Sequence, residues 1–264
     1  MIGWVDAFTD TAFGGNPAAV CLVDPAAPLD EATMAALAHE FGISETAFVV
    51  PTPHLGPATF SLRWFTPSVE VDLCGHATLA SAHALRQWGV VDGAVPITFA
   101  TRSGPLLASF GAERISLDFP AAPMRAAALP APLIGQWGSE LVVASGRSDH
   151  FAVVVLADQG AVADYVPDLG AIAAVDASAL LITARGDSAD YVVRVFGPNV
   201  GIDEDPATGS AHCTAGPYWH EVLGRDEMVA KQLSERGATF YVRPDGERVH
   251  IAGHAVTVLS GDLC

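Results

Sequence analysis

The chain has 264 residues, 50% of them hydrophobic and 16% charged, which suits one large or two small globular cores and excludes a disordered chain. The formal net charge of −17 disfavours nucleic acid and anionic membrane surfaces as partners. No apolar run reaches the roughly 20 residues that span a bilayer, and the first residues lack the basic and apolar regions of a signal peptide.

The first half of the chain is expected to contain several strands and two helices. Asp30 can cap a helix over Glu31–Phe41, and Gly42 can end that helix in the left-handed conformation. A second helix, rich in Ala and Leu, is predicted over Ala77–Trp88. Strand patterns cover 4–8, 18–23, 45–50, 59–65 and 114–119, with a hairpin over 97–110.

The second half repeats this plan with one main helix. The hairpin expected last turns at 244–246, and Pro217 is expected to end or bend the main helix, which runs to about Leu223. A loop is expected at 145–150. Strands are predicted at 141–144, 151–156, 179–183, 191–196, 240–243 and 249–259, with a short helix at 167–175.

One stretch of sequence occurs twice. Arg63-Trp64-Phe65-Thr66-Pro67 matches Arg194-Val195-Phe196-Gly197-Pro198 at an offset of 131 residues (194 − 63), and Ala77-Thr78 matches Ala207-Thr208 at 130 (207 − 77). A duplicated unit predicts two pseudo-twofold-related domains. We expect an α+β fold in which each domain is a sheet rolled around a central helix. The predicted domains are 1–119 and 133–264, joined by an Ala/Pro-rich junction at 120–132.

In both copies a loop leads into a helix that begins with small residues. Uncovered amide groups at such a helix start favour an anion, here a small carboxylate, and Gly75, Gly209 and Ser210 can supply them. If the domains are related by a pseudo-twofold axis, the two loops face each other across a cleft, where ligands commonly bind.

Three polar residues in these settings are candidates for proton transfer. Glu45 can be a general base or a strand-edge carboxylate in water. His76 can donate to a substrate or make an ordinary local hydrogen bond, and Asp205 can pair with His76 or cap the helix that follows. Asp203 and Glu204 are more typical of a solvated acidic face.

The four cysteines, Cys21, Cys74, Cys213 and Cys264, are scattered and form no CxxC pair, so reduced thiols and a cytoplasmic location are expected. Cys74 can be a thiolate base, but a small buried residue is the commoner role of a free cysteine. His212, Cys213 and His220 have no recognised metal-ligand spacing. No flavin, nicotinamide or ATP motif is present, so neither cofactor nor metal is indicated.

Four motifs in the right order resemble the phenazine-biosynthesis PhzF-like family, which is related in fold to diaminopimelate epimerase. They are FGGNPAAV at 13–20, SETAFV at 44–49, LCGHATLASAHAL at 73–85 and DEDPATGSAHC at 203–213. The resemblance extends over nearly the whole chain and implies a cofactor-free isomerase that is usually a homodimer.

The resemblance also implies roles for single residues. The phenazine enzyme of the family isomerises trans-2,3-dihydro-3-hydroxyanthranilate, and the glutamate that serves as its base matches Glu45. Its other acid–base residues match His76 and Asp205. Positions that hold the substrate or line the site match Asn16, Gly75, Gly209 and Ser210.

The chain departs from the phenazine enzyme around His212-Cys213 and 217–219, so its substrate is left open. The alternatives are an amino-acid racemase or epimerase that uses Cys74, and a protein that binds small molecules without turnover. Because the second loop offers Asp205-Pro206 instead of a thiol, a two-thiol mechanism is disfavoured.

Overall fold

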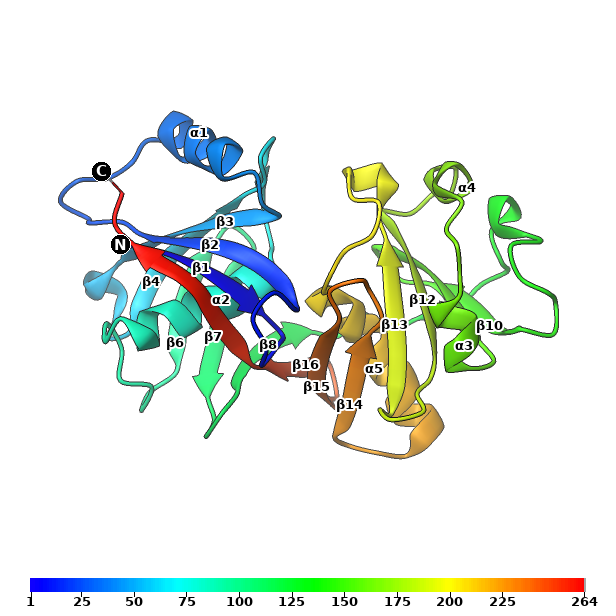
Figure 1. The fold of residues 1–264 in the computed structure, drawn as a ribbon. Coiled ribbons are helices and arrows are strands. Elements are labelled where there is room, and N and C mark those ends of the chain that lie inside the picture. Colours follow the sequence, from blue (N-terminus) through cyan, green and yellow to red (C-terminus); the bar gives the residue numbers. More distant parts are fainter. Residues whose placement is uncertain (264) are drawn as a thin grey trace. The chain divides into compact units, whose positions relative to one another are not determined.

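The computed structural model describes residues 1–263, which pack into two compact units (Figure 1). The first unit contains Met1–Asp118 and 252–263, and the second contains Phe119–Ile251. This division differs from the expected one at two places: the last strand belongs to the first unit, and residues 120–132 belong to the second.

Strand pairing explains both differences. Strand β17 (Ala255–Gly261) pairs antiparallel with β1 (Ile2–Ala7) and so extends the sheet of the first unit. The stretch expected to be a junction contributes β9 (Arg125–Ala126), which pairs with β10 (Val142–Arg147). Leu133, directly after this stretch, is fully buried in the core of the second unit.

The first unit is a mixed, mostly antiparallel sheet with the strand order β17-β1-β2-β3-β4-β6-β7-β8. Only the pairs β2–β3 and β4–β6 are parallel among these described strands, and a parallel pair needs a crossover connection. Helices α1 and α2 lie in those two connections. The remaining elements are β2 (Asn16–Leu22), α1 (Glu31–Phe41), β3 (Glu45–Pro51), β4 (Thr59–Phe65), β5 (Glu70–Val71), α2 (Gly75–Gln87), β6 (Ile97–Thr101), β7 (Gly104–Phe110) and β8 (Ile115–Pro120).

The second unit repeats these pairings in the same order. Its strands β10 to β15 pair successively as antiparallel, parallel, antiparallel, parallel and antiparallel, as β1, β2, β3, β4, β6 and β7 do. The expected duplication of the fold is therefore present within the two units. The remaining elements are β11 (Phe151–Leu156), α3 (Gln159–Ala163), α4 (Leu169–Ala173), β12 (Ala179–Arg185), β13 (Tyr191–Phe196), α5 (Gly209–Leu223), β14 (Met228–Gln232), β15 (Ala238–Asp245) and β16 (Arg248–Gly253).

Helix α2 lies at the centre of the first unit. Nine of its 13 residues are buried, and it packs against β1, β2, β3, β7 and β17. These strands come from both ends of the strand order, so the sheet curves around the helix as expected. Helix α5 is likewise largely buried and packs against β15.

The predicted ends of helix α1 are confirmed. Asp30 accepts a hydrogen bond from the Thr33 amide at 2.8 Å, which satisfies one of the free donors at the start of the helix. Gly42 ends the helix with a φ of 61°, a left-handed conformation that costs glycine little.

Helix α5 does not end at Pro217 but runs to Leu223, the end expected for it. Proline removes the amide that would bond to the carbonyl four residues earlier, which is that of Cys213. Here the Cys213 carbonyl accepts a hydrogen bond from the Ala122 amide at 3.0 Å instead. Because the orphaned carbonyl has another donor, the helix continues through Pro217 to Leu223.

Several other boundaries also differ from the sequence prediction. Strand β10 runs to Arg147, so the loop expected at 145–150 is only three residues long. The long strand expected at 249–259 is two strands, interrupted at His254. Helix α3 and strand β14 were not predicted.

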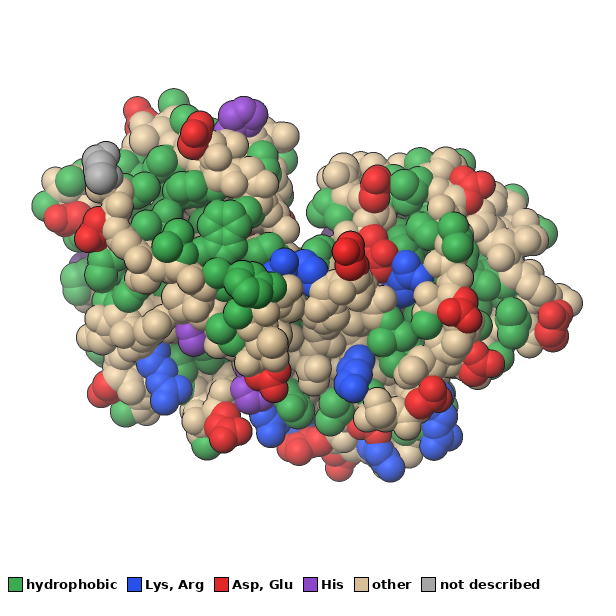
Figure 2. All heavy atoms as spheres, viewed as in Figure 1, with side chains coloured by type: hydrophobic (Ala, Val, Ile, Leu, Met, Phe, Trp, Pro, Cys, Tyr) green, Lys and Arg blue, Asp and Glu red, His purple; other side chains and the backbone are tan. Residues whose placement is uncertain are grey.

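On the face drawn in Figure 2, Lys and Arg side chains lie among acidic ones and form no continuous basic patch. Among the described residues, no helix is both long and apolar enough to cross a membrane.

Candidate functional site

Glu45 is the first residue of β3, next to the start of β2 in the first unit. The parallel register pairs Ala18 with Glu45, so Asn16 lies two residues earlier on the neighbouring strand. Asn16 is completely buried and pairs with Ala7 of β1. The sheet therefore brings two of the predicted site residues to the same end of adjacent strands.

The start of helix α2 brings three further residues to this end of the unit. Cys74 is the cap residue, and Gly75 and His76 are the first two residues of the helix. The Thr78 hydroxyl donates to the Cys74 carbonyl at 2.6 Å, which fixes this first turn. Because α2 packs against β3, the first turn can meet Glu45.

Glu45 and His76 are in direct contact. The distance from His76 Nε2 to Glu45 Oε2 is 3.0 Å, and the two side chains are only 8% and 12% exposed. The expectation of a solvated strand-edge glutamate is thereby excluded in this structure. Oε2 is buried and makes no well-aligned hydrogen bond among the described residues, and its contact with His76 is an ion pair when the imidazole is protonated.

Cys74 contacts the other side of the same imidazole. Its Sγ lies 3.5 Å from His76 Nδ1, and the thiol is buried. The histidine therefore lies between a thiol and a carboxylate. One donor atom from each of Glu45, Cys74 and His76 lies within 4.8 Å of the others, so these are described residues that could hold a metal ion.

Burial and charge act in opposite directions on this cluster. Burial disfavours a charged imidazole, but the negative charges of Cys74 and Glu45 outweigh it and raise the pKa of His76 well above its usual value. Burial first, and then the Glu45 charge, raise the pKa of the Cys74 thiol.

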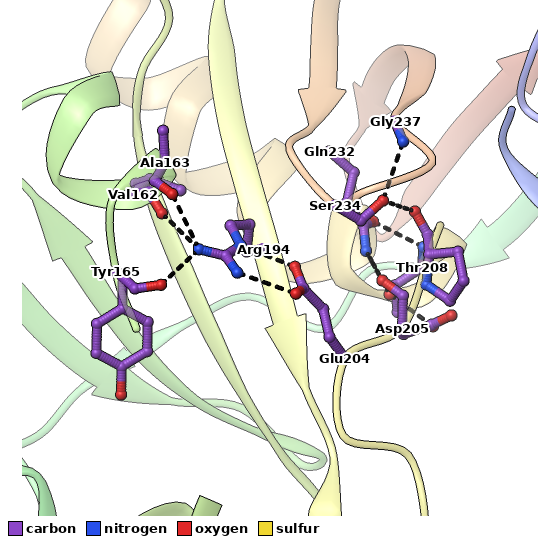
Figure 3. Close-up of polar contacts among 11 residues, drawn as sticks. Val162, Ala163, Tyr165, Arg194, Glu204, Asp205, Thr208, Gln232, Ser234 and Gly237 are labelled. Atoms are coloured by element: carbon purple, nitrogen blue, oxygen red, sulfur yellow. Dashed lines mark hydrogen bonds and ion pairs between the residues drawn. The ribbon is translucent and has the colours of Figure 1, made fainter. Parts of the chain in front are cut away.

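The second unit contains the other predicted site residues, Asp205, Gly209 and Ser210. Asp205 Oδ2 accepts a hydrogen bond from the Thr208 hydroxyl at 2.6 Å, and the Asp205 carbonyl accepts one from Gln232 Nε2 at 2.6 Å (Figure 3). Asp205 is not the helix cap that was considered as its alternative role, because Thr208 occupies the cap position.

Gln232 holds the start of helix α5. Its Oε1 accepts from the Thr208 amide at 2.7 Å, while Nε2 donates to Asp205 and to the Thr208 hydroxyl (Figure 3). Ser234 adds a hydrogen bond to the Pro206 carbonyl at 2.6 Å. The sequence contained no signal for this role of Gln232, because it lies in a different strand, 24 residues after Thr208.

Glu204 is not part of a solvated acidic face, contrary to expectation. It binds Arg194 through two contacts of 2.7 and 2.9 Å, and Arg194 Nη1 also donates to the carbonyls of three residues (Figure 3). Those carbonyls belong to Val162, Ala163 and Tyr165.

The two helix starts correct the alignment of the repeat. Gly75 begins α2 and Gly209 begins α5, an offset of 134 (209 − 75). The match of Ala77-Thr78 with Ala207-Thr208 was therefore wrong, because the first pair lies inside its helix and the second precedes its helix. Thr208 is the residue equivalent to Cys74, so the second unit has a hydroxyl where a second thiol would be needed.

His212 and Cys213 lie inside the second unit. His212 is fully buried, and its Nδ1 lies 2.8 Å from the Tyr191 hydroxyl. Burial lowers the pKa of His212 to about 3 and raises that of Cys213 to about 12. Cys21, Cys74 and Cys213 are free and buried, and Cys264 lies outside the described residues.

Chemically, the Glu45–His76 pair can accept and donate a proton in a site with little water. The first amides of an α-helix have no acceptor within the helix, so those of Gly75, Gly209 and Ser210 suit a carboxylate. Ser210 is exposed, Gly75 is partly buried and Gly209 is buried.

Comparisons with known proteins agree with this description. A family model described as "Phenazine biosynthesis-like protein" matches residues 5–261. A protein of Halalkalibacterium halodurans named an uncharacterized isomerase is 42% identical over 263 residues, covering 98% of this chain and 96% of its own.

Solved structures show the same fold. The crystal structure of a phenazine biosynthesis protein of the PhzF family from Enterococcus faecalis has a TM-score of 0.91 at 37% identity, covering 98% of this chain and 96% of that one. A predicted epimerase from Pseudomonas aeruginosa shares the fold at 23% identity, with a TM-score of 0.72 and coverage of 99% and 98%. The expected epimerase-like fold class is confirmed.

Proposed function

The chain belongs to the phenazine biosynthesis-like family of isomerases, and we propose that it moves a proton on a small carboxylate-bearing substrate without a cofactor. The observation that carries this proposal is the buried contact of 3.0 Å between His76 Nε2 and Glu45 Oε2. A carboxylate and an imidazole held together out of water can act as base and acid in one proton shift.

In this mechanism Glu45 removes a proton from a substrate carbon, and the negative charge spreads into the conjugated carboxylate. Glu45 exchanges its proton with solvent and returns a proton at a different carbon, so the substrate is isomerised without net change in composition. His76 holds the carboxylate of Glu45 in place and donates to the substrate. A positioned acid–base group contributes roughly 10²–10⁴-fold to the rate.

Asp205 and the amides of Gly75, Gly209 and Ser210 complete the proposal. We assign Asp205 a supporting role in proton transfer, and the amides the binding of the substrate carboxylate. The support for Asp205 is the DPATGS motif, together with the way Thr208 and Gln232 hold the aspartate.

A homodimer also remains a prediction, which light scattering can test.

The test is hydrogen–deuterium exchange into substrate carbon in D₂O, followed by mass spectrometry in the presence of a chelator. The first probe is trans-2,3-dihydro-3-hydroxyanthranilate, followed by small amino- and hydroxy-carboxylates. We expect Glu45→Gln to slow exchange by at least about 100-fold while the chain still folds and binds. Glu40→Gln, the same change at an exposed glutamate of the same unit, is the control.

Three results would contradict the proposal. Exchange at the wild-type rate in Glu45→Gln removes the base from the mechanism. Exchange that survives Glu45→Gln but is lost in Cys74→Ser favours the cysteine-dependent racemase instead. Binding of a probe without any exchange favours the non-catalytic alternative.

A further inference from the structure

Four hydrogen bonds join Asp205, Thr208 and Gln232 into one chain (Figure 3). Gln232 Oε1 faces the Thr208 amide at 2.7 Å, while Gln232 Nε2 faces the Asp205 carbonyl at 2.6 Å and Thr208 Oγ1 at 3.1 Å. The Thr208 hydroxyl in turn lies 2.6 Å from Asp205 Oδ2. The whole chain belongs to the second unit.

The orientation of the Gln232 amide is fixed by its two backbone partners. A backbone N–H can only donate, and a backbone carbonyl can only accept. Turning the side-chain amide over would place its oxygen against the Asp205 carbonyl oxygen and its nitrogen against the Thr208 amide, so both contacts would be lost. Gln232 therefore presents its nitrogen to Thr208 Oγ1 and is the donor there.

The direction of the next hydrogen bond follows from this orientation. The Thr208 hydroxyl has one proton, and Thr208 is only 9% exposed, so this proton needs an acceptor inside the protein. Gln232 Nε2 cannot accept it, and the acceptor that the structure provides is Asp205 Oδ2. The hydrogen bonds therefore run one way, from Gln232 through Thr208 to the Asp205 carboxylate.

This direction also favours the ionised form of Asp205. A proton on Oδ2 would have to be donated to Thr208 Oγ1, which already accepts from Gln232. The Thr208 hydroxyl proton would then have lost its acceptor, and a buried donor without a partner costs free energy. The arrangement therefore suits an Oδ2 that carries no proton.

The start of helix α2 is built differently. Cys74 is the residue equivalent to Thr208, but its Sγ lies 3.5 Å from the ring nitrogen Nδ1 of His76. The first unit thus presents an imidazole, which can donate a proton, where the second presents a carboxylate that accepts hydrogen bonds. This difference assigns opposite roles to the two helix starts.

We propose that Gln232 and Thr208 are positioning residues that hold Asp205 as an ionised hydrogen-bond acceptor. Asp205 then accepts a hydrogen bond from the substrate and does not supply a proton to it. Both positioning residues act through Asp205. The statement about the substrate rests on the proposed function, whereas the direction of the hydrogen bonds does not.

Deuterium exchange into trans-2,3-dihydro-3-hydroxyanthranilate tests the role of the Thr208 hydroxyl. Thr208→Val removes the hydroxyl with little change in shape and should lower kcat/KM by at least about 10-fold. Thr208→Ser restores the hydroxyl and should remain within about 3-fold of the wild type. Exchange at the wild-type rate in Thr208→Val, or an equal loss in both variants, would overturn the role.

Gln232→Glu tests the donor nitrogen. This variant keeps an oxygen for the Thr208 amide but replaces Nε2 with a second acceptor, so the hydroxyl proton can turn away from Asp205. We expect kcat/KM to fall by at least about 10-fold. Gln159→Glu, the same change at a glutamine that accepts one exposed backbone hydrogen bond, is the control and should exchange as the wild type does. Wild-type exchange in Gln232→Glu would overturn the proposal.

Neutron diffraction from crystals grown in D₂O tests the direction of the hydrogen bonds without any substrate. We expect deuterium on Thr208 Oγ1, directed at Asp205 Oδ2, and deuterium on Gln232 Nε2, directed at the Asp205 carbonyl. Deuterium on Asp205 Oδ2 would overturn the proposal. A wild type that exchanges with none of the substrate probes defeats only the proposed function, and the neutron map then decides the direction by itself.

Discussion

Arg63 of the first unit and Arg194 of the second each bind one glutamate and one phenylalanine ring in the same way. Arg63 binds Glu70 through two contacts of 2.7 Å, and Arg194 binds Glu204 through contacts of 2.7 and 2.9 Å. Each guanidinium also lies over the ring of the phenylalanine two residues further along its strand, at 5.1 and 4.9 Å. The duplication has therefore preserved an ion pair beside each helix start.

The two pairs should differ in their contribution to stability. Arg194 is 11% exposed and satisfies three backbone carbonyls besides Glu204, whereas Arg63 is 27% exposed. We expect Arg194→Ala to lower the free energy of unfolding by about 3 kcal/mol, because Glu204 and three backbone carbonyls lose the donor that they share. Arg63→Ala should cost about 1 kcal/mol, because Glu70 keeps its ion pair with Arg102. Urea denaturation of both variants tests this, and a larger loss for Arg63→Ala would contradict it.

Gln232 should be important for the second unit although it lies outside every motif. Gln232→Leu leaves the Thr208 amide and the Asp205 carbonyl without their partner, which predicts a loss of about 2–4 kcal/mol of unfolding free energy. Gln159→Leu is the control, because Gln159 accepts one exposed backbone hydrogen bond, from Asp187. Equal losses in the two variants, measured by urea denaturation, would show that Gln232 does not hold the loop from Asp205 to Thr208.

The Ala122 amide replaces the amide that Pro217 lacks as the donor to the Cys213 carbonyl, and a double-mutant cycle can test this replacement. Ala122→Pro removes the donor to the Cys213 carbonyl and should cost about 1–3 kcal/mol. In a Pro217→Ala background the new amide at position 217 can reach that carbonyl, so Ala122→Pro should cost less. Additive losses in chemical denaturation would mean that the two donors do not substitute for each other.

His212 should make the protein acid-sensitive. Burial lowers its pKa in the folded chain from 6.5 to about 3, so between these values the unfolded chain binds a proton that the folded chain does not. The stability from this group is complete above pH 6.5 and is lost as the pH falls towards 3. Between about pH 7 and about pH 5 the wild type should lose roughly 2 kcal/mol more than His212→Phe.

The wild type and His212→Phe are compared by the slope of their unfolding free energy against pH. The absolute values cannot be compared directly, because His212→Phe also removes the contact with Tyr191. His220→Phe is the control at an exposed histidine of the same helix. An unchanged slope in His212→Phe would show that another group dominates the acid response.

Local patterns in the sequence predicted most elements of the first unit. The ends of α1 follow from Asp30 and Gly42, and β4 follows from its alternating residues. What the sequence could not predict depends on partners far along the chain. The effect of Pro217 depended on Ala122, which donates to the carbonyl that proline leaves free.

The candidate site shows the same limit. Glu45 and His76 were predicted from motifs and are in contact, but the order thiol–imidazole–carboxylate follows only from packing α2 against β3. Gln232 and the pairing of Glu204 with Arg194 had no local signature. The residues equivalent in the two halves could be aligned correctly only once Gly75 and Gly209 were seen to begin their helices.

The pairing of β17 with β1 has a consequence for how the chain folds during synthesis. Translation reaches Ala255 only after the whole second unit has been made, so until then β1 lacks its neighbour on one side. An unpaired strand edge invites association with other chains. The second unit can therefore mature on the ribosome before the first, and loss of the last dozen residues should harm the half of the protein that was translated earliest.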